Sequence, residues 1–406
     1  MNCNRTSYAT AVLLLIAVAA QSFDAGVTYA GSCETSGNWS SVGGGLAGVD
    51  PQVRAITTWV PPGQSTPRLY FAGKFSTDES EEVTLNSIAE WDGTILNALT
   101  EDGRDPGIPT GGMNDEVRVL TVYDGVLVAG GQFTIEETMC LPEIHSLAAW
   151  DGMKWNTDDY DFGLAPLSSV HAVLPRGASL YVGGNIQLPS DMAAEWQVAV
   201  WDGTDWTSLG LPEAFDKVLC LGWYGGELYA GGSVSELKDP KSIFAKWDGD
   251  EWVDIGLEAE LDFDHVAVMV EFEGSLYVGG WFPNPNCSGT TVLIAWNGST
   301  WTNVPFGTAT MSNSTGVSHL HVDGEGCDSL IVSGQFRFTE CDDGDCDHTT
   351  SDNVHIAYFH GRFGNGDLAV CALPVGGGTS DGGPVCVATI GATGRRIFVG
   401  SQGAAD

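Results

Sequence analysis

Hydrophobic residues along this chain fall in short runs, and they do not recur at the interval of an amphipathic helix. The runs are bounded by glycine and other turn-forming residues, as in the segment from Val170 to Gly184. Short apolar or alternating runs between turn residues are typical of β-strands. The pattern therefore predicts an all-β protein in which helix is at most a minor component.

One of these runs is repeated along the chain. An apolar strand is followed by a turn and then by the phrase Leu-Tyr-Val-Gly-Gly or a close variant, whose seven copies begin at Leu69, Leu127, Leu180, Leu228, Leu276, Leu330 and Ile397. In five copies a valine precedes the first residue of the phrase by ten positions, at Val117, Val170, Val218, Val266 and Val387. A constant spacing across a glycine turn predicts a β-hairpin of fixed length.

A second phrase, Trp-Asp-Gly-x-x-Trp, follows most of these hairpins. Asp-Gly is a strong turn signal, so the phrase predicts a second hairpin with its two aromatic residues directly opposite each other. The first aromatic residues stand at 91, 150, 201, 247, 296 and 359, a period near fifty that suits four short strands per repeat. We interpret the tryptophans as packing between repeats: Trp150, Trp155, Trp201, Trp206, Trp247, Trp252, Trp296 and Trp301.

Together the two phrases resemble the repeats of kelch and galactose-oxidase-type β-propellers. They are still more similar to uncharacterised exported bacterial propeller repeats, and they resemble the fungal cell-polarity marker propellers. The resemblance covers roughly residues 39 to 401. It implies a β-propeller of about seven four-stranded blades, with six as the alternative, and it implies no particular function because propellers carry many.

The two ends of the repeat array are complementary. The last hairpin, around Val387 and Gly400, has no second phrase after it, whereas the segment from Asn38 to Gly43 is a second half without a first. We predict that this N-terminal strand joins the last blade and closes the ring, with residues 27–31 as a further candidate strand. A truncated C-terminus is the alternative. The predicted organisation is a signal peptide (1–20), an arm or part of the closing blade (21–38), the propeller (39–401) and a tail (402–406).

Export is predicted from the N-terminus, and the charge limits the possible partners. Arg5 precedes an apolar run from Ala11 to Ala20, which is typical of a signal peptide and too short to span a bilayer. The chain has 53 acidic against 16 basic residues, and its net charge is −37. Such a surface disfavours nucleic acid and anionic membrane. We expect a soluble, secreted or otherwise extracytoplasmic protein without a transmembrane span; an uncleaved anchor is the alternative.

In an exported chain most of the cysteines are expected to be oxidised. Cys220 lies in an apolar strand and is predicted to be a buried free thiol. The others in the exported part are expected to form disulfides in loops, with Cys341–Cys346 and Cys371–Cys386 as the local pairs. The complete set is Cys33, Cys140, Cys287, Cys327, Cys341, Cys346, Cys371 and Cys386. Zinc ligation by the cysteines is the competing interpretation.

Two groups of residues are candidate metal ligands. A short acidic loop between two cysteines could supply several oxygen ligands to calcium, through Asp342, Asp343, Asp345 and Asp347, although an acidic loop in solvent is the simpler interpretation. His319 and His321 alternate on one strand, so both imidazoles would lie on one face, where they could bind a metal or be ordinary strand residues. No cofactor other than calcium is expected.

A candidate ligand site comes from the residues that follow the strand valines: Arg54, Arg118, His171, Leu219, Ala267, Ser318 and Ala388. If these strands are innermost, three basic groups on neighbouring blades, Arg54, Arg118 and His171, would face a central channel. In so acidic a protein they could bind an anion or a sugar acid.

No complete catalytic set is visible, and the repeated residues are all used by the fold. We therefore predict a non-enzymatic binding or surface-interaction module, monomeric, for an extracellular glycan or protein. A carbohydrate-active hydrolase or lyase is the alternative. A copper oxidase is less favoured, because no tyrosine lies near the histidine pair to complete its ligand set.

Overall fold

The computed structural model describes the chain in sections. They are residues 14–15, 45–48, 51–78, 80–99, 113–135, 143–155, 160–188, 191–210, 215–234, 242–257, 264–283, 290–304, 316–323, 329–336, 339–342, 345–349, 354–360, 369–372, 384–390 and 396–401. Every regular element in these sections is a β-strand. The described residues contain no helix that is long and apolar enough to cross a membrane.

Most strands form antiparallel sheets in which strands that follow one another in the chain are neighbours. The first sheet contains β3 (Gln52–Trp59), β4 (Arg68–Lys74), β6 (Ile88–Trp91) and β7 (Leu96–Ala98). The second contains β8 (Val117–Tyr123), β9 (Val126–Ile135) and β10 (Ile144–Trp150). The third contains β11 (Ser169–Arg176), β12 (Ser179–Leu188), β13 (Asp191–Trp201) and β14 (Trp206–Gly210).

The next strands repeat the order. They are β15 (Lys217–Tyr224), β16 (Glu227–Ser233), β17 (Phe244–Trp247) and β18 (Trp252–Asp254), then β19 (His265–Phe272), β20 (Ser275–Pro283), β21 (Thr290–Trp296) and β22 (Trp301–Asn303). A single pair, Ser233 with His265, joins these two sets into one continuous sheet. A further sheet contains β23 (Gly316–Asp323), β24 (Ser329–Phe336), β27 (Val354–His360) and β28 (Ala369–Ala372). Two small two-stranded sheets lie outside this order: β2 (Leu46–Ala47) with β5 (Thr77–Asp78), and β25 (Thr339–Asp342) with β26 (Asp345–Thr349).

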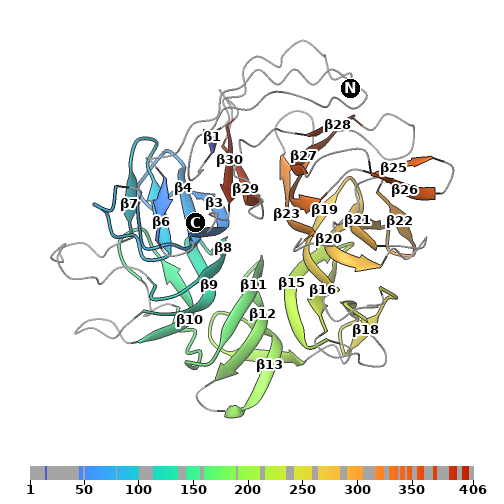
Figure 1. The fold of residues 1–406 in the computed structure, drawn as a ribbon. Helices are drawn as coiled ribbons and strands as arrows, with labels where there is room; N and C mark the ends of the chain where they lie inside the picture. The colour runs from blue at the N-terminus through green and yellow to red at the C-terminus, as the bar shows by residue number, and fades with distance from the viewer. Residues whose placement is uncertain are drawn as a thin grey trace.

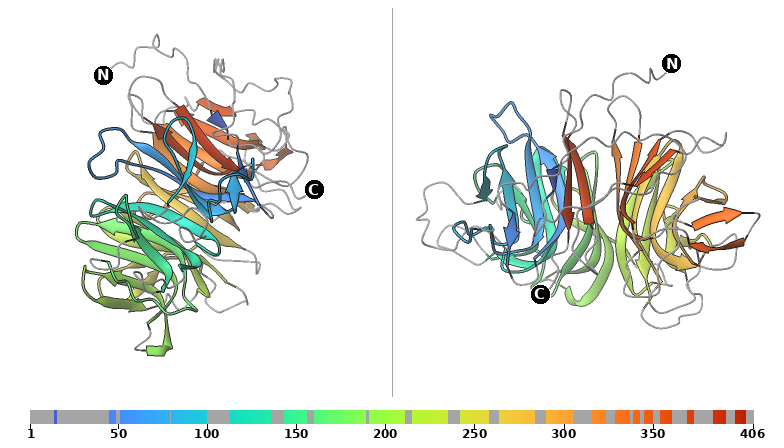
Figure 2. Two further views of the ribbon diagram at one scale, coloured as in Figure 1. Left: turned by 90° about the vertical axis from the view of Figure 1, so that its left-hand side faces the viewer. Right: turned by 45° about the horizontal axis from the view of Figure 1, so that its top comes forward.

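The sheets are arranged around a central axis. Their first strands contact one another in the order β3, β8, β11, β15, β19, β23 and β29 (Pro384–Ile390), and β29 contacts β3. Figure 1 shows these strands nearest the centre with the later strands of each sheet further out, and Figure 2 shows the sheets fanning around the axis. This arrangement confirms the predicted all-β propeller.

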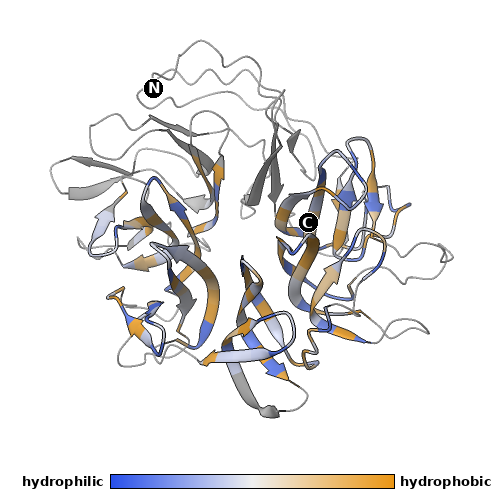
Figure 3. Cartoon of the chain, turned by 180° about the vertical axis from the view of Figure 1, so that it is seen from behind, coloured by the Kyte–Doolittle hydropathy of each residue, from blue (hydrophilic) through white to orange (hydrophobic). Residues whose placement is uncertain are grey.

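The hydrophobic core is divided among the spaces between neighbouring sheets. One cluster joins Tyr70 and Ile88 of the first sheet to Val117 and Leu127 of the second. Other clusters join the second sheet to the third, the third to the β15–β18 set, and so on around the ring. Hydrophobic residues accordingly follow the strands (Figure 3). A lone sheet of this size would be marginal, so packing against two neighbours is what stabilises each one.

The last sheet differs from the predicted closure. Its described strands are β29 and β30 (Arg396–Ser401), and β30 pairs in parallel with β1 (Leu14–Leu15). An N-terminal strand does lie on the last sheet, but it belongs to the predicted signal peptide. The segments that the sequence favoured, residues 27–31 and 38–43, lie outside the described residues. The number of complete blades therefore stays a prediction.

Candidate functional site

The second glycine of each Gly-Gly pair shapes the start of the first strand. A Cβ placed on Gly131 would lie 2.2 Å from the carbonyl oxygen of Glu116, and one on Gly184 would lie 2.1 Å from that of Ser169. Only glycine allows the two strands to approach this closely. At this point the pairing register shifts by one residue, so that each first strand contains a β-bulge.

The bulged residues form a row around the ring, which we call the bulge row: Arg54, Arg118, His171, Leu219, Ala267, Ser318 and Val385. The row thus contains all three basic residues that the sequence singled out. A bulge re-aims the side chain of its extra residue. From Arg54 to Ser318 each of these side chains keeps partial access to solvent, next to a buried valine.

The seventh member of the row was predicted wrongly. The spacing from the phrase placed Ala388 there, but Ala388 pairs regularly with Phe398, and the register shift lies between Pro384 and Cys386. The reason is the number of residues that connect the two strands of the hairpin. The strands β29 and β30 are separated by residues 391–395, whereas β8 ends at Tyr123 and β9 begins at Val126. Counting residues across turns of unequal length gives the wrong register.

Arg54 and Arg118 share one carboxylate. Nε of Arg54 donates to Oε1 of Glu116 at 2.7 Å, and Nε of Arg118 donates to Oε2 of the same residue at 2.9 Å. The arginine side chains are 34% and 25% exposed, and that of Glu116 is 15% exposed. The two positive charges lower the pKa of Glu116 against the opposing effect of its own burial. The group is therefore Arg⁺–Glu⁻–Arg⁺, with one net positive charge.

All three guanidinium nitrogens of Arg118 have hydrogen-bond partners, whereas in Arg54 only Nε has one among the described residues. The terminal nitrogens of Arg118 donate to Oγ of Ser169 at 2.6 Å and to Oε1 of Gln132 at 3.3 Å. Among the described residues, the hydrogen bonding of Arg54 is confined to its Nε atom and Glu116. The terminal fork of Arg54 therefore keeps its donors for another partner.

His171 lies beside this group on the next strand. Burial, and after it the positive charges of Arg118 and Lys217, lowers the pKa of His171 to about 4, while Glu116 acts in the opposite direction. At neutral pH the imidazole is therefore uncharged, with one nitrogen as donor and the other as acceptor. From the sequence we expected three basic groups at this place. In the structure only the two arginines are charged at neutral pH, because His171 is neutral.

Sequence reasoning missed the residues that organise the arginines. Glu116 and Ser169 each stand directly before a strand valine, and Gln132 follows a Gly-Gly pair. A register signal was present, because these residues occupy equivalent places in successive repeats. What the repeat did not indicate is that Glu116 reaches across to the neighbouring strand β3.

The tryptophan phrase forms the expected hairpin. Trp201 pairs with Trp206, and Trp296 pairs with Trp301, with ring centroids 5.3 and 4.9 Å apart. Trp247 pairs with Trp252 in the same way, and a bridge joins Trp150 to Trp155.

The Asp-Gly turn also has a constant geometry. In the loop before Trp206, Oδ1 of Asp202 accepts hydrogen bonds from the backbone of Thr204 and Asp205 at 2.9 and 2.8 Å. These hydrogen bonds lower the pKa of Asp202. Asn297 accepts the same two backbone hydrogen bonds in its own loop. Capping of the loop explains the aspartate, so this residue needs no catalytic role.

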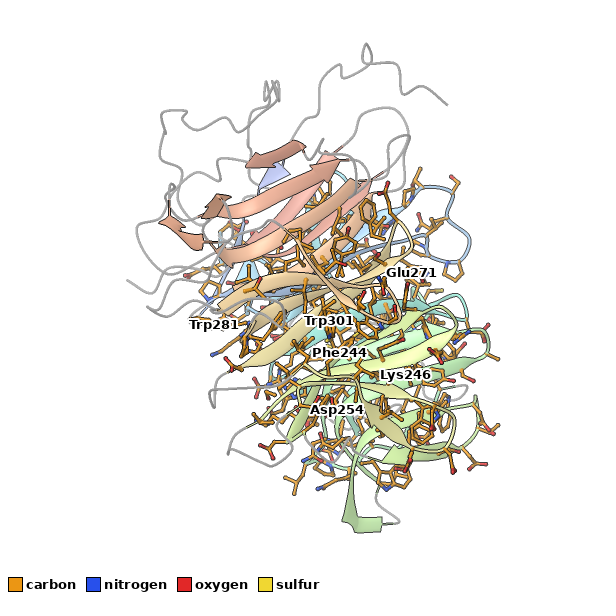
Figure 4. All side chains as sticks on the ribbon, turned by 90° about the vertical axis from the view of Figure 1, so that its right-hand side faces the viewer. Phe244, Lys246, Asp254, Glu271, Trp281 and Trp301 are labelled. Atoms are coloured by element: carbon orange, nitrogen blue, oxygen red, sulfur yellow. The ribbon has the colours of Figure 1, made fainter. Side chains whose placement is uncertain are left out.

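Several contacts of these tryptophans cross from one sheet to the next. Nε1 of Trp252 donates to the backbone oxygen of Leu209 on β14 at 2.9 Å. Phe244 of β17 packs against Trp301 of β22, with centroids 5.3 Å apart (Figure 4). These aromatic side chains belong to the packing of the ring.

The histidine pair does not assemble a metal site in the described part of the chain. His319 and His321 lie on β23, opposite Ser333 and Ile331 of β24. Within the sections that the structure describes, no group of three histidine, cysteine, aspartate or glutamate residues is placed to hold a metal ion. Metal binding by these histidines stays a hypothesis.

The acidic loop and most cysteines lie where side chains are not described. Asp342 and Asp345 pair across the β25–β26 hairpin, Asp347 is on β26, and Asp343 lies outside the described residues. The predicted disulfides likewise fall outside the described side chains. Cys220 is buried, and its thiol donates to the carbonyl oxygen of Val266 at 3.7 Å. Burial raises its pKa, so the thiol is protonated and unreactive at neutral pH.

Fold and site together define the class: a β-propeller whose innermost strands carry a row of bulged side chains. No family model matches the chain, and no curated protein matches it. Among solved structures it is similar to the WD40 β-propeller domain of Doa1, with 13% sequence identity, 88% of this chain and 92% of that chain covered, and a TM-score of 0.45. Nothing is inferred from a similarity at that score, and the class of protein follows from the arrangement of the strands alone.

Proposed function

We propose that the protein is a non-enzymatic binding module, exported from the cytoplasm, that takes its ligand at the bulge row. The observation that carries the proposal is a division of labour among residues. Glycines and tryptophans recur from sheet to sheet and are used in packing and turns. The bulge row, by contrast, keeps the same backbone geometry while its side chains differ from sheet to sheet.

Such a division is what a binding scaffold requires. A repeated backbone presents side chains at fixed positions, and the side chains that vary determine what is bound. Export is supported by the N-terminal sequence, and an extracellular glycan or protein is the expected partner. A carbohydrate-active enzyme built on the same scaffold would instead turn over its ligand.

The test combines retention with turnover. The secreted protein is applied to a glycan array and, separately, incubated with a panel of polysaccharides while reducing ends are measured. We expect retention on a subset of glycans without release of reducing ends. Release of reducing ends would contradict the proposal and favour a hydrolase or lyase.

The location of the site is tested with a triple variant, Arg54→Ala, Arg118→Ala and His171→Ala. We expect retention to be lost. The matched control is Arg68→Ala, because Arg68 is also ion-paired to a glutamate, Glu90, but on the strands β4 and β6 away from the row. Undiminished retention by the triple variant would place the site elsewhere.

A further inference from the structure

We infer that the ligand of the bulge row is a small carboxylic acid rich in hydroxyl groups, such as a monomeric sugar acid, with its carboxylate held by the free fork of Arg54. This inference rests on the proposed function and specifies its ligand class. A planar guanidinium with unused donors is the side chain best suited to bind a carboxylate through two parallel hydrogen bonds.

The roles of the two arginines differ. Arg118 is committed to Glu116, Ser169 and Gln132, so it acts as a positioning residue that fixes the carboxylate of Glu116. Glu116 in turn holds Nε of Arg54, which orients the terminal nitrogens of Arg54 away from that contact. Because the guanidinium is rigid and planar, fixing Nε fixes the direction of the fork.

The groups around Arg118, on the far side of Glu116 from Arg54, suit hydroxyl groups better than a second anion. Ser169 and Gln132 contact Arg118, and the neutral His171 lies near it. Each of the three combines donor and acceptor capacity, and Glu116 can accept. A ligand with alternating hydroxyls could satisfy such a mixed set, whereas inorganic sulfate or phosphate, which offers mainly acceptors, could not.

Acidic residues at equivalent places in the repeats limit the charge of the ligand. Asp115, Asp216 and Asp264 stand two positions before the strand valines of β8, β15 and β19. They add negative charge at the start of these innermost strands, and the whole chain carries −37. A polyanion would be repelled by this surface, while one carboxylate can be bound over the short range of a direct hydrogen bond.

The opposite part of the row is small and mainly apolar. Leu219, Ala267 and Ser318 occupy the positions equivalent to the arginines, and all three are half-buried. None of these three side chains carries a charge, so the charged part of the row is confined to Arg54 and Arg118.

Isothermal titration calorimetry with glucuronate tests the inference, with glucose and a sulfated disaccharide as comparison probes. We expect glucuronate to bind, glucose to bind at least tenfold more weakly, and the polyanionic probe not to bind. Arg54→Gln is expected to weaken glucuronate at least tenfold, and Arg68→Gln, the control outside the row, is expected to leave it unchanged.

Glu116→Gln separates a binding role from a purely structural one. The amide can accept from only one of the two arginines, so the fork of Arg54 loses its fixed direction. We therefore expect glucuronate to bind severalfold more weakly while the binding of glucose is unchanged. Unchanged binding of glucuronate by this variant, or an Arg54→Gln variant that binds as well as the native protein, would overturn the inference. If glucuronate fails to bind while the glycan array still shows retention, the ligand class is wrong and the proposed function survives. Turnover in the polysaccharide assay overturns the proposed function itself.

Discussion

At the scale of single residues, glycine determines most of the geometry around the site. The first glycine of each pair lies under the valine of the next sheet: a Cβ on Gly183 would be 2.9 Å from Cγ1 of Val218. The second glycine creates the bulge that presents the variable side chain. Two adjacent glycines thus serve two purposes, one in packing between sheets and one in building the site.

His171 makes the stability of the protein depend on pH. Its pKa is about 4 in the folded chain, and an unfolded histidine titrates near 6.5. Between these values the unfolded state binds more protons, so this contribution to stability is complete above pH 6.5 and is lost as the pH falls towards 4. Each pKa unit corresponds to about 1.4 kcal/mol, so the loss is on the order of 3 kcal/mol.

The measurement is urea unfolding at pH 7 and pH 4.5. We expect His171→Gln, which cannot become charged, to lose about 2 kcal/mol less between these pH values than the native protein does. Equal losses in the two proteins would show that His171 is accessible to protons in the folded state.

At the scale of elements, neighbouring hairpins are joined in a regular way that no single repeat reveals. Nε1 of Trp59, at the end of β3, donates to the carbonyl oxygen of Gly125 in the next hairpin turn at 3.1 Å. The hydroxyl groups of Tyr123 and Tyr224 make equivalent hydrogen bonds, to Ala178 at 2.6 Å and to Gly274 at 2.9 Å. Each of these three first strands, β3, β8 and β15, therefore holds the hairpin turn of the following sheet.

The contact between Gly183 and Val218 makes a prediction about how elements pack. Gly183→Ala inserts a methyl group against Cγ1 of Val218, and we expect a loss of about 1–3 kcal/mol in the free energy of unfolding. In the double variant Gly183→Ala, Val218→Ala the clash is relieved, so the combined loss should fall short of the sum of the single losses by about 1 kcal/mol. Additive losses would show that the neighbouring sheets do not press together at this point.

At the scale of the whole molecule, the question is which N-terminal strand closes the ring. The structure places Leu14 and Leu15 beside β30. Cleavage after residue 20, which the N-terminal sequence predicts, would remove this strand and expose the edge of β30. An exposed strand edge favours association with another chain, so another segment is needed to cover it.

Two deletions distinguish the closing strands. We expect the protein without residues 1–20 to be monomeric and stable, and the protein that also lacks residues 31–45 to aggregate and to melt at lower temperature. Light scattering after gel filtration and thermal unfolding provide the two readouts. If removal of residues 1–20 alone causes aggregation, β1 is the closing strand and the signal-peptide prediction is wrong.

Much of the fold could be predicted because its signals are local. The hairpin that pairs Trp201 with Trp206 follows from the turn residues between them, and the repeat itself predicts sheets that need neighbours. Registers across unequal turns could not be predicted in this way, as the error at Ala388 shows. The site was predicted only in part: Arg54, Arg118 and His171 were found from their place in the repeat, whereas the partner that joins them, Glu116, was not.

The sequence by itself determined the class of fold, the recurrent turns and the positions that vary, because each of these depends on residues close together along the chain. The tertiary structure decided which site residues are charged and which of the charges are paired. Only the packing of neighbouring strands places Glu116 between two arginines and buries His171 enough to keep it neutral. These effects depend on distance and desolvation across sheets, which linear spacing does not encode.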